Sequence, residues 1–132
     1  MTDPKTQIES QMAIYFDGLY RSDVEQLSRV FAPEARYVCA TGGEVVNLGL
    51  DEYFPIVARR EPPAARGEVR RDEIASITLA GDSAALVVAH CAIGERFFTD
   101  FLSFIRTADG WRIVAKVFHY DIQPSPAPAG KE

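Results

Sequence analysis

The segment of residues 97–120, FFTDFLSFIRTADGWRIVAKVFHY, constrains the fold more than any other part of this chain. Two runs rich in β-branched and aromatic residues flank Asp109-Gly110, a dipeptide that favours a tight turn, so the segment predicts a long β-hairpin. Nearly every position is apolar, whereas a strand with one solvated face alternates apolar and polar residues. We therefore expect both faces of the hairpin to be covered, one by helices of the same chain and the other by a second subunit.

The rest of the chain predicts three helices and further strands. Apolar residues at helical spacing indicate a helix over residues 5–20, a short second helix that Pro33 ends, and a third from Asp51 to about Arg60. Residue patterns typical of strands occur at residues 36–40, 44–48, 68–80, 84–94, 97–106 and 111–122.

This order of elements predicts an α+β fold, in which the helices pack on one face of a strongly curved antiparallel sheet. Residues 1–122 form a single domain in this prediction. The proline-rich residues 123–132 have almost nothing to bury, and we expect a disordered tail there.

The charge and the cysteine content limit which binding partners and which cellular compartment we expect. The net charge is −5 and the isoelectric point about 5.0, so no surplus of Lys and Arg exists to neutralise nucleic acid or an anionic membrane. The first ten residues lack a secretory signal pattern, and no apolar run approaches the length of a membrane span. Cys39 and Cys91 lie far apart without CxxC spacing, which predicts two buried thiols in a reducing cytoplasm.

The sequence indicates neither a metal site nor a cofactor. His90 and Cys91 have no third and fourth ligand at suitable spacing, and no glycine-rich loop is present to hold a phosphate. The pairs Arg59-Arg60 and Arg70-Arg71 predict solvated charge, with anion binding as the alternative.

Several short motifs carry a resemblance to a known family. They are Tyr15, Gly18-Leu19-Tyr20, Asp23, Phe31-x-Pro33-x-Ala35, Leu50-Asp51-Glu52-Tyr53, Phe98-Thr99-Asp100-Phe101-Leu102-Ser103 and Trp111-Arg112-Ile113-Val114-x-Lys116-Val117-Phe118. With the order of elements, they resemble the nuclear-transport-factor-2-like superfamily of cone-shaped α+β proteins over about residues 5–121. Within it, the chain is most similar to the "putative lumazine-binding" branch, beside SnoaL-like polyketide cyclases and ketosteroid isomerases. Members share the cone and differ in what it holds, so the fold does not fix the function.

The resemblance to ketosteroid isomerases extends to one of their three functional positions. An approximate ungapped comparison puts their oxyanion-hole tyrosine at Tyr15, their general-base aspartate at Cys39 and their second aspartate near Ser103. A cysteine does not replace a carboxylate that shuttles protons near neutral pH, because its unperturbed pKa is about 8.5. The comparison therefore argues against isomerase chemistry of that kind.

Asp100 is an acidic residue on a dense apolar hairpin, so it needs a partner. A two-residue Asp109-Gly110 turn would pair Asp100 with His119, and a four-residue loop would place the two on a diagonal of one face. A three-residue loop would instead put Asp100 beside Lys116 and Phe118. A structural pair, a ligand-orienting role and catalysis all stay open for Asp100.

The leading interpretation is a cytoplasmic homodimer, paired through the convex face of the sheet, that binds a small molecule in an apolar pocket inside the cone. The expected ligand-binding residues are Tyr15, Tyr37, Tyr53, Phe54, Phe101, Lys116, Phe118 and Tyr120. The alternative is a SnoaL-like cyclase, isomerase or dehydratase that uses Tyr15 with Asp100 or His119 on an enolisable substrate. A second alternative is a structural or protein-interaction module whose own side chains fill the cavity.

Overall fold

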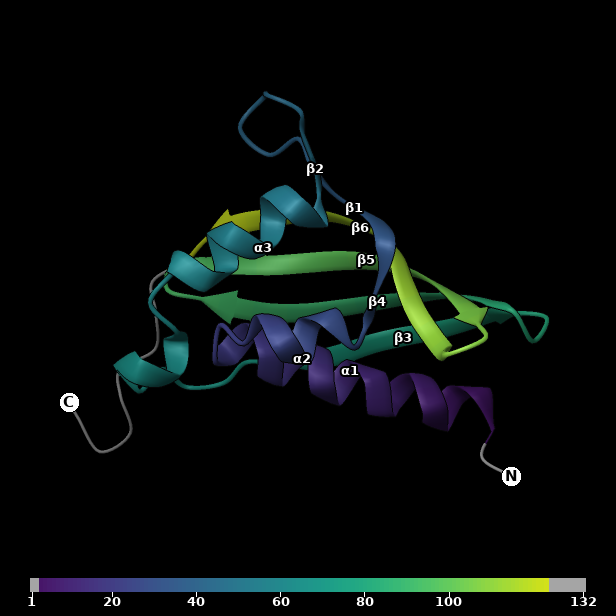
Figure 1. The fold of residues 1–132 in the computed structure, drawn as a ribbon. Helices are drawn as coiled ribbons and strands as arrows, with labels where there is room; N and C mark the ends of the chain where they lie inside the picture. The colour runs from purple at the N-terminus through teal and green to yellow at the C-terminus, as the bar shows by residue number, and fades with distance from the viewer. Residues whose placement is uncertain (1–2, 124–132) are drawn as a thin grey trace.

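The computed structural model describes residues 3–123, in which three α-helices lie on one face of a six-stranded sheet (Figure 1). The elements in chain order are α1 (Pro4–Tyr20), α2 (Val24–Ser28), β1 (Phe31–Cys39), β2 (Val46–Gly49), α3 (Leu50–Arg59), the 3-10 turn η1 (Pro63–Arg66), β3 (Glu73–Ala80), β4 (Ala84–Ile93), β5 (Arg96–Thr107) and β6 (Gly110–Ile122). We call the helix-covered face of the sheet the inner face and the opposite one the outer face.

The strands run in the order β2-β1-β6-β5-β4-β3. Every neighbouring pair is antiparallel except β1 and β6, which are parallel. The predicted α+β class with helices on one face of a bent sheet is confirmed, with the refinement that the sheet is mixed. The parallel pair joins β1, the first strand of the chain, to β6, the last.

The first two helices begin at aspartate caps and pack closely on each other. Asp3 accepts a hydrogen bond from the Thr6 backbone N–H at 2.8 Å, and Asp23 accepts one from Gln26 at 3.2 Å. At Gly18 a Cβ atom would lie 2.8 Å from the side chain of Leu27, so glycine lets α1 and α2 approach each other. The inner face of α1 consists of Ile8, Met12, Tyr15, Phe16 and Leu19, all buried.

The second helix is shorter than predicted. It ends at Ser28, and Phe31 opens β1 instead of closing the helix. Pro33 is exposed within β1, where the pairing with β6 shifts register between Phe31 and Arg36. A proline has no N–H to donate to a ladder, so a break in the pairing is where a strand tolerates it.

The register of the β5–β6 hairpin decides which side chains reach the inner face. Thr107 pairs with Gly110 around a two-residue loop, and Phe104 pairs with Ile113, but Ser103 pairs with Ala115. Val114 is thus an extra residue in β6, a bulge that shifts all later pairs by one.

As a result, Asp100 pairs with Phe118 and Thr99 pairs with His119. The register that would pair Asp100 with His119 is wrong, and the two side chains point to opposite faces. The pairing is the one expected from a three-residue loop, but the bulge at Val114 produces it instead.

Alternation along β5 separates a buried face from an open one. Phe98, Asp100, Leu102 and Phe104 are buried on the inner face. Phe101 is 50% exposed on the outer face, where Val117 of β6 (46%) and Leu86 of β4 (41%) are also open. The face that the helices leave uncovered is therefore apolar.

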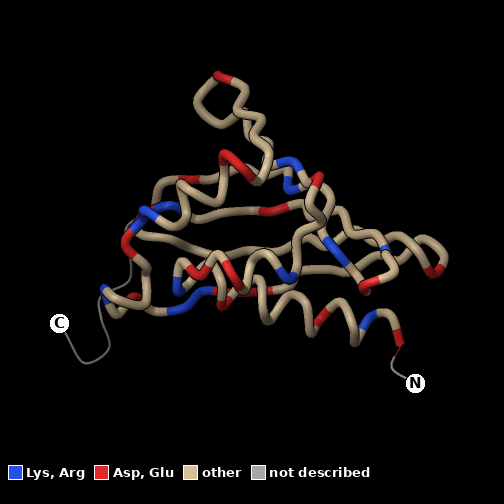
Figure 2. Tube along the Cα trace, in the orientation of Figure 1, with Lys and Arg blue, Asp and Glu red and all other residues tan. Residues whose placement is uncertain are grey.

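Charged residues of both signs are interspersed over helices, loops and strand ends (Figure 2). Among the described residues, no helix is long and apolar enough to cross a membrane. Most of the predicted tail, residues 124–132, lies outside the described residues. Gln123 is the exception, and its N–H donates to the Glu95 carbonyl at 2.6 Å.

Candidate functional site

A buried hydrogen bond joins α1 to the middle of the sheet. The hydroxyl of Tyr15 donates to Oδ2 of Asp100 at 2.6 Å, and both residues are 0% exposed. Burial, followed by the nearby Asp100 charge, raises the pKa of the Tyr15 phenol well above its usual value. Tyr15 is therefore a neutral donor. Asp100, rather than Ser103, is the residue that lies against it.

The second oxygen of Asp100 is an open acceptor. Oδ1 is buried and has no hydrogen-bond partner among the described residues. Cys91 lies on the same side, with its Sγ 3.9 Å from Oδ2. Burial raises the pKa of the Cys91 thiol, so it stays protonated and unreactive as a nucleophile. A buried carboxylate oxygen without a partner is rare in a filled core.

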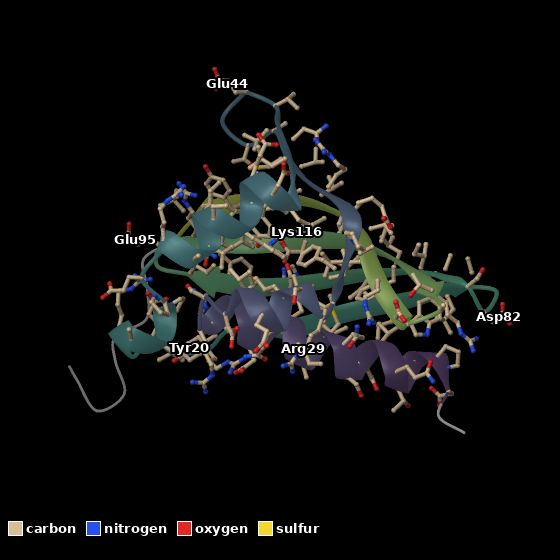
Figure 3. The ribbon with its side chains drawn as sticks, viewed as in Figure 1. Tyr20, Arg29, Glu44, Asp82, Glu95 and Lys116 are labelled. Atoms are coloured by element: carbon tan, nitrogen blue, oxygen red, sulfur yellow. The ribbon has the colours of Figure 1, made fainter. Side chains whose placement is uncertain are left out.

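Lys116 is enclosed by aromatic rings. Its Nζ lies 5.3–5.6 Å from the ring centres of Tyr15, Tyr37, Tyr53 and Phe118, and the residue is 4% exposed. These distances allow cation–π attraction to four rings. Figure 3 shows Lys116 near the middle of the molecule.

Lys116 forms no ion pair with any carboxylate of residues 3–123. Burial alone lowers the pKa of its ammonium, but the oxygens of Tyr53 and Asp100 outweigh this and raise that pKa above its ordinary value. Lys116 is therefore a buried cation stabilised by rings and by the field of Asp100, without a direct ionic contact.

The rings around Lys116 form a continuous wall. Tyr37 stacks on Tyr53 with centroids 4.2 Å apart, and it meets Phe118 at 4.7 Å. The wall continues from Phe118 to Phe98 at 5.7 Å and then to Tyr120 at 5.8 Å. Strands β1, β5 and β6 and helix α3 all contribute to it, so it depends on the complete fold.

Arg60 adds a second cation at the end of α3. Its backbone N–H caps the helix by donating to Val57, and its Nε and Nη2 atoms are buried without a partner. The sequence predicted that both side chains of Arg59-Arg60 are solvated, but Arg60 is half-buried in the structure. The spacing of Tyr53, Val57 and Arg60 (i, i+4, i+7) is the signal that places Arg60 on the buried face of α3.

The structure brings most of the predicted ligand-binding residues together. Tyr15, Tyr37, Tyr53, Lys116 and Phe118 meet on the inner face around Asp100, and we call these six residues the inner cluster. Phe54 and Tyr120 are half-buried beside it, Phe54 against Phe31 and Tyr120 against Phe98.

Two predicted residues lie elsewhere. Phe101 and His119 are on the outer face, so neither can line a pocket inside the fold. His119 contacts Thr41 Oγ1 at 2.9 Å through Nδ1 and Asp121 Oδ1 at 3.0 Å through Nε2. It therefore cannot act together with Tyr15 or Asp100.

Surface hollows occur at the β5–β6 turn and on the outer face, where Phe118 of the inner cluster is among the lining residues. One of about 480 Å³ lies at the β5–β6 turn, lined by Gln7, Ser10, Gln11 and residues 106–112. Another of about 470 Å³ opens on the outer face beside Thr41 and His119. The first contains no residue of the inner cluster, and its lining is held by internal bonds such as Trp111 Nε1 to Gln7 Oε1 at 3.0 Å.

A comparison with known protein families shows which family this chain belongs to. A family described as "Putative lumazine-binding" matches residues 3–119, nearly the whole described fold. The chain belongs to this family. A comparison with curated proteins found no match.

Solved structures similar to this family member share its fold. A nuclear-transport-factor-2-like protein of unknown function from Silicibacter pomeroyi is 22% identical, with a TM-score of 0.78 over 88% of this chain and 94% of that one. A similar protein from Shewanella baltica is 19% identical, with a TM-score of 0.79 over 89% and 93%. A ketosteroid isomerase-like protein from Erwinia carotovora atroseptica is 13% identical, with a TM-score of 0.70 over 91% and 98%. These likenesses show a nuclear-transport-factor-2-like fold.

Proposed function

We propose that this protein binds a small, partly apolar molecule on the inner face of its sheet, at the inner cluster. The observation that carries the proposal is the buried Tyr15–Asp100 pair, in which Asp100 Oδ1 has no donor although aromatic rings surround it. A filled core satisfies its buried polar atoms. The membership in a family described by the binding of a small molecule supports the same conclusion.

The inner cluster offers complementary contacts to a flat molecule. The faces of Tyr37, Tyr53 and Phe118 supply apolar area, Asp100 Oδ1 accepts a hydrogen bond, and the Lys116 ammonium supplies donors. A ligand with an apolar ring and one donor group matches this set. The two cysteines are buried and free, which fits a protein that works in the cytoplasm.

Native mass spectrometry of the protein as purified tests this proposal. We expect an adduct of small-molecule mass that denaturation releases, and we expect Asp100→Asn to lower its occupancy. Arg36→Gln serves as the matched control, because Arg36 is exposed on β1 and its side chain hydrogen-bonds to Asn47. If the wild-type protein carries no adduct and binds no member of a library of flat aromatic compounds, the proposal fails and a structural role for Asp100 replaces it.

We further propose that the outer face pairs with a second copy of the chain. A row of apolar side chains crosses it, in which Val88, Phe101, Val117 and Val38 pair in turn on four neighbouring strands. An exposed apolar face of this extent is typical of an interface. A two-fold axis would bring the same face of each copy together.

Sedimentation at micromolar concentration checks the dimer. The wild-type protein should sediment as a dimer, and Phe101→Lys should convert it to a monomer because it would bury an unpaired charge at the interface. Val45→Lys is the control, since Val45 is 74% exposed in the loop between β1 and β2. A monomeric wild-type protein would contradict the interface.

A second candidate function is favoured by the 2.6 Å Tyr15–Asp100 bond itself. A neutral phenol beside a carboxylate can act on an enolisable substrate, as in cyclases, isomerases or dehydratases. The Tyr15 hydroxyl would turn its one proton from Asp100 to the enolate oxygen, and the freed Asp100 carboxylate would take the proton from the substrate carbon. Once the ligand is known, the wild-type protein and the Asp100→Asn variant can be compared for its turnover. Equal rates in the two proteins would remove this candidate.

A further inference from the structure

We infer that Arg60 is an anion-recognition subsite and that the ligand carries one negative charge on a planar group, as a carboxylate does. The inference rests on the proposed binding function and names the chemical class of its ligand. It also assigns a specificity-determining role to a residue outside the inner cluster.

The unpartnered atoms of Arg60 form one edge of its guanidinium group. Nε and Nη2 are buried and make no hydrogen bond within residues 3–123. These two nitrogens point their N–H groups in the same direction, which is the fork that binds both oxygens of a carboxylate. Leaving such donors buried and unpaired is costly, so a matching acceptor is expected when the protein is in use.

The position of Arg60 directs this fork toward the inner face. Arg60 follows Tyr53 and Val57 on the buried side of α3, and Tyr53 stacks on Tyr37 of β1. We infer from this spacing that the fork faces the Tyr37–Tyr53 stack.

The guanidinium edge of Arg60 has no matching carboxylate among the described residues. Lys116 and Asp100 are the buried charged residues of the described chain, and the guanidinium edge of Arg60 adds a second cation. The carboxylates near Arg60 in sequence are committed elsewhere: Glu61 pairs with Arg66 at 3.3 Å. The buried guanidinium edge of Arg60 thus has no carboxylate partner among the described residues, and an anionic group of the ligand would neutralise it.

Together these features describe a ligand with two ends. Its anionic end lies in the Arg60 fork, its ring lies against the Tyr37–Tyr53 stack, and its donor reaches Asp100 Oδ1. A neutral molecule of the same shape would leave Arg60 unpaired. The structure therefore favours an aromatic or otherwise unsaturated acid over its neutral analogue.

Binding of 2-naphthoate and of neutral 2-naphthamide, measured by titration calorimetry, tests the inference. The wild-type protein should bind the acid at least ten-fold more tightly than the amide. Arg60→Gln should weaken the acid to the level of the amide and leave the amide unchanged, and Arg60→Lys should restore part of the difference. Arg59→Gln, the neighbouring exposed arginine, should change neither probe.

The outcomes separate this inference from the proposed function. Equal binding of both probes to the wild-type protein and to Arg60→Gln would keep the binding site and overturn the role of Arg60. Binding of neither probe at millimolar concentration would overturn both. The melting temperature of ligand-free Arg60→Gln should equal or exceed that of the wild-type protein, because the substitution removes a guanidinium edge that is buried without a partner, and a clear fall would assign Arg60 a structural role instead.

Discussion

Phe104→Ala is expected to lower the free energy of unfolding by about 3–5 kcal/mol, the usual cost of removing a ring from a packed core. Phe104 is 1% exposed on the inner face of β5, where Ala85 and Ile113 are its neighbours in the adjacent strands. The surrounding side chains belong to three strands and cannot all move to fill the space. The cost should therefore include a cavity as well as lost burial.

Phe101→Ala is the matched control, because it makes the same change three residues away on the same strand. Phe101 is half exposed on the outer face, so the monomer should lose less than about 1 kcal/mol. Urea unfolding at two protein concentrations separates this intrinsic effect from any loss of dimer stability. Similar losses for the two variants at low concentration would mean that the two faces of β5 are assigned incorrectly.

The assignment of residues to the two faces of this hairpin was only partly predictable from the sequence. The apolar run 97–120 predicted the hairpin and the face that the helices cover, because composition and turn chemistry are local properties, while the cover of the other face stays a prediction. It did not predict the bulge at Val114, since no glycine or other local signal marks that residue. One extra residue changes the face of every side chain beyond it, and so it decided whether Asp100 shared a face with His119 or lay beside Phe118.

The same limit applies to the site. Helical spacing and the family resemblance suggested Tyr15, Tyr53 and Lys116, and these lie together in the structure, while their binding role stays a prediction. Phe101 was predicted to bind the ligand because an apolar run does not show which face of the sheet each of its residues will occupy. Arg60 was predicted to be solvated because charged side chains usually are, and the competing signal, its spacing from Tyr53, is visible only on a helical projection.

Asp100→Ala is expected to lower the free energy of unfolding by about 3–5 kcal/mol, as the loss of one partner from a buried polar cluster does. The substitution leaves the Tyr15 hydroxyl without its acceptor and the Lys116 ammonium without the only buried carboxylate of the described chain. Asp109→Ala, at an exposed position in the β5–β6 turn, is the control and should cost far less. Chemical denaturation of both variants gives the comparison.

Second substitutions separate two contributions to the cost of Asp100→Ala, which are the uncompensated charge of Lys116 and the lost hydrogen bond with Tyr15. Tyr15→Phe alone removes a hydrogen bond to a charged group and should cost about 1.5–3 kcal/mol. Tyr15→Phe combined with Asp100→Ala should cost less than the sum of the two, because both remove the same bond. Lys116→Met places a flexible apolar chain among the same rings, so Asp100→Ala with Lys116→Met should be more stable than Asp100→Ala alone. If Lys116→Met does not restore stability to Asp100→Ala, the cost of losing Asp100 comes from the Tyr15 hydrogen bond and local packing. The aromatic rings then stabilise Lys116 without the carboxylate.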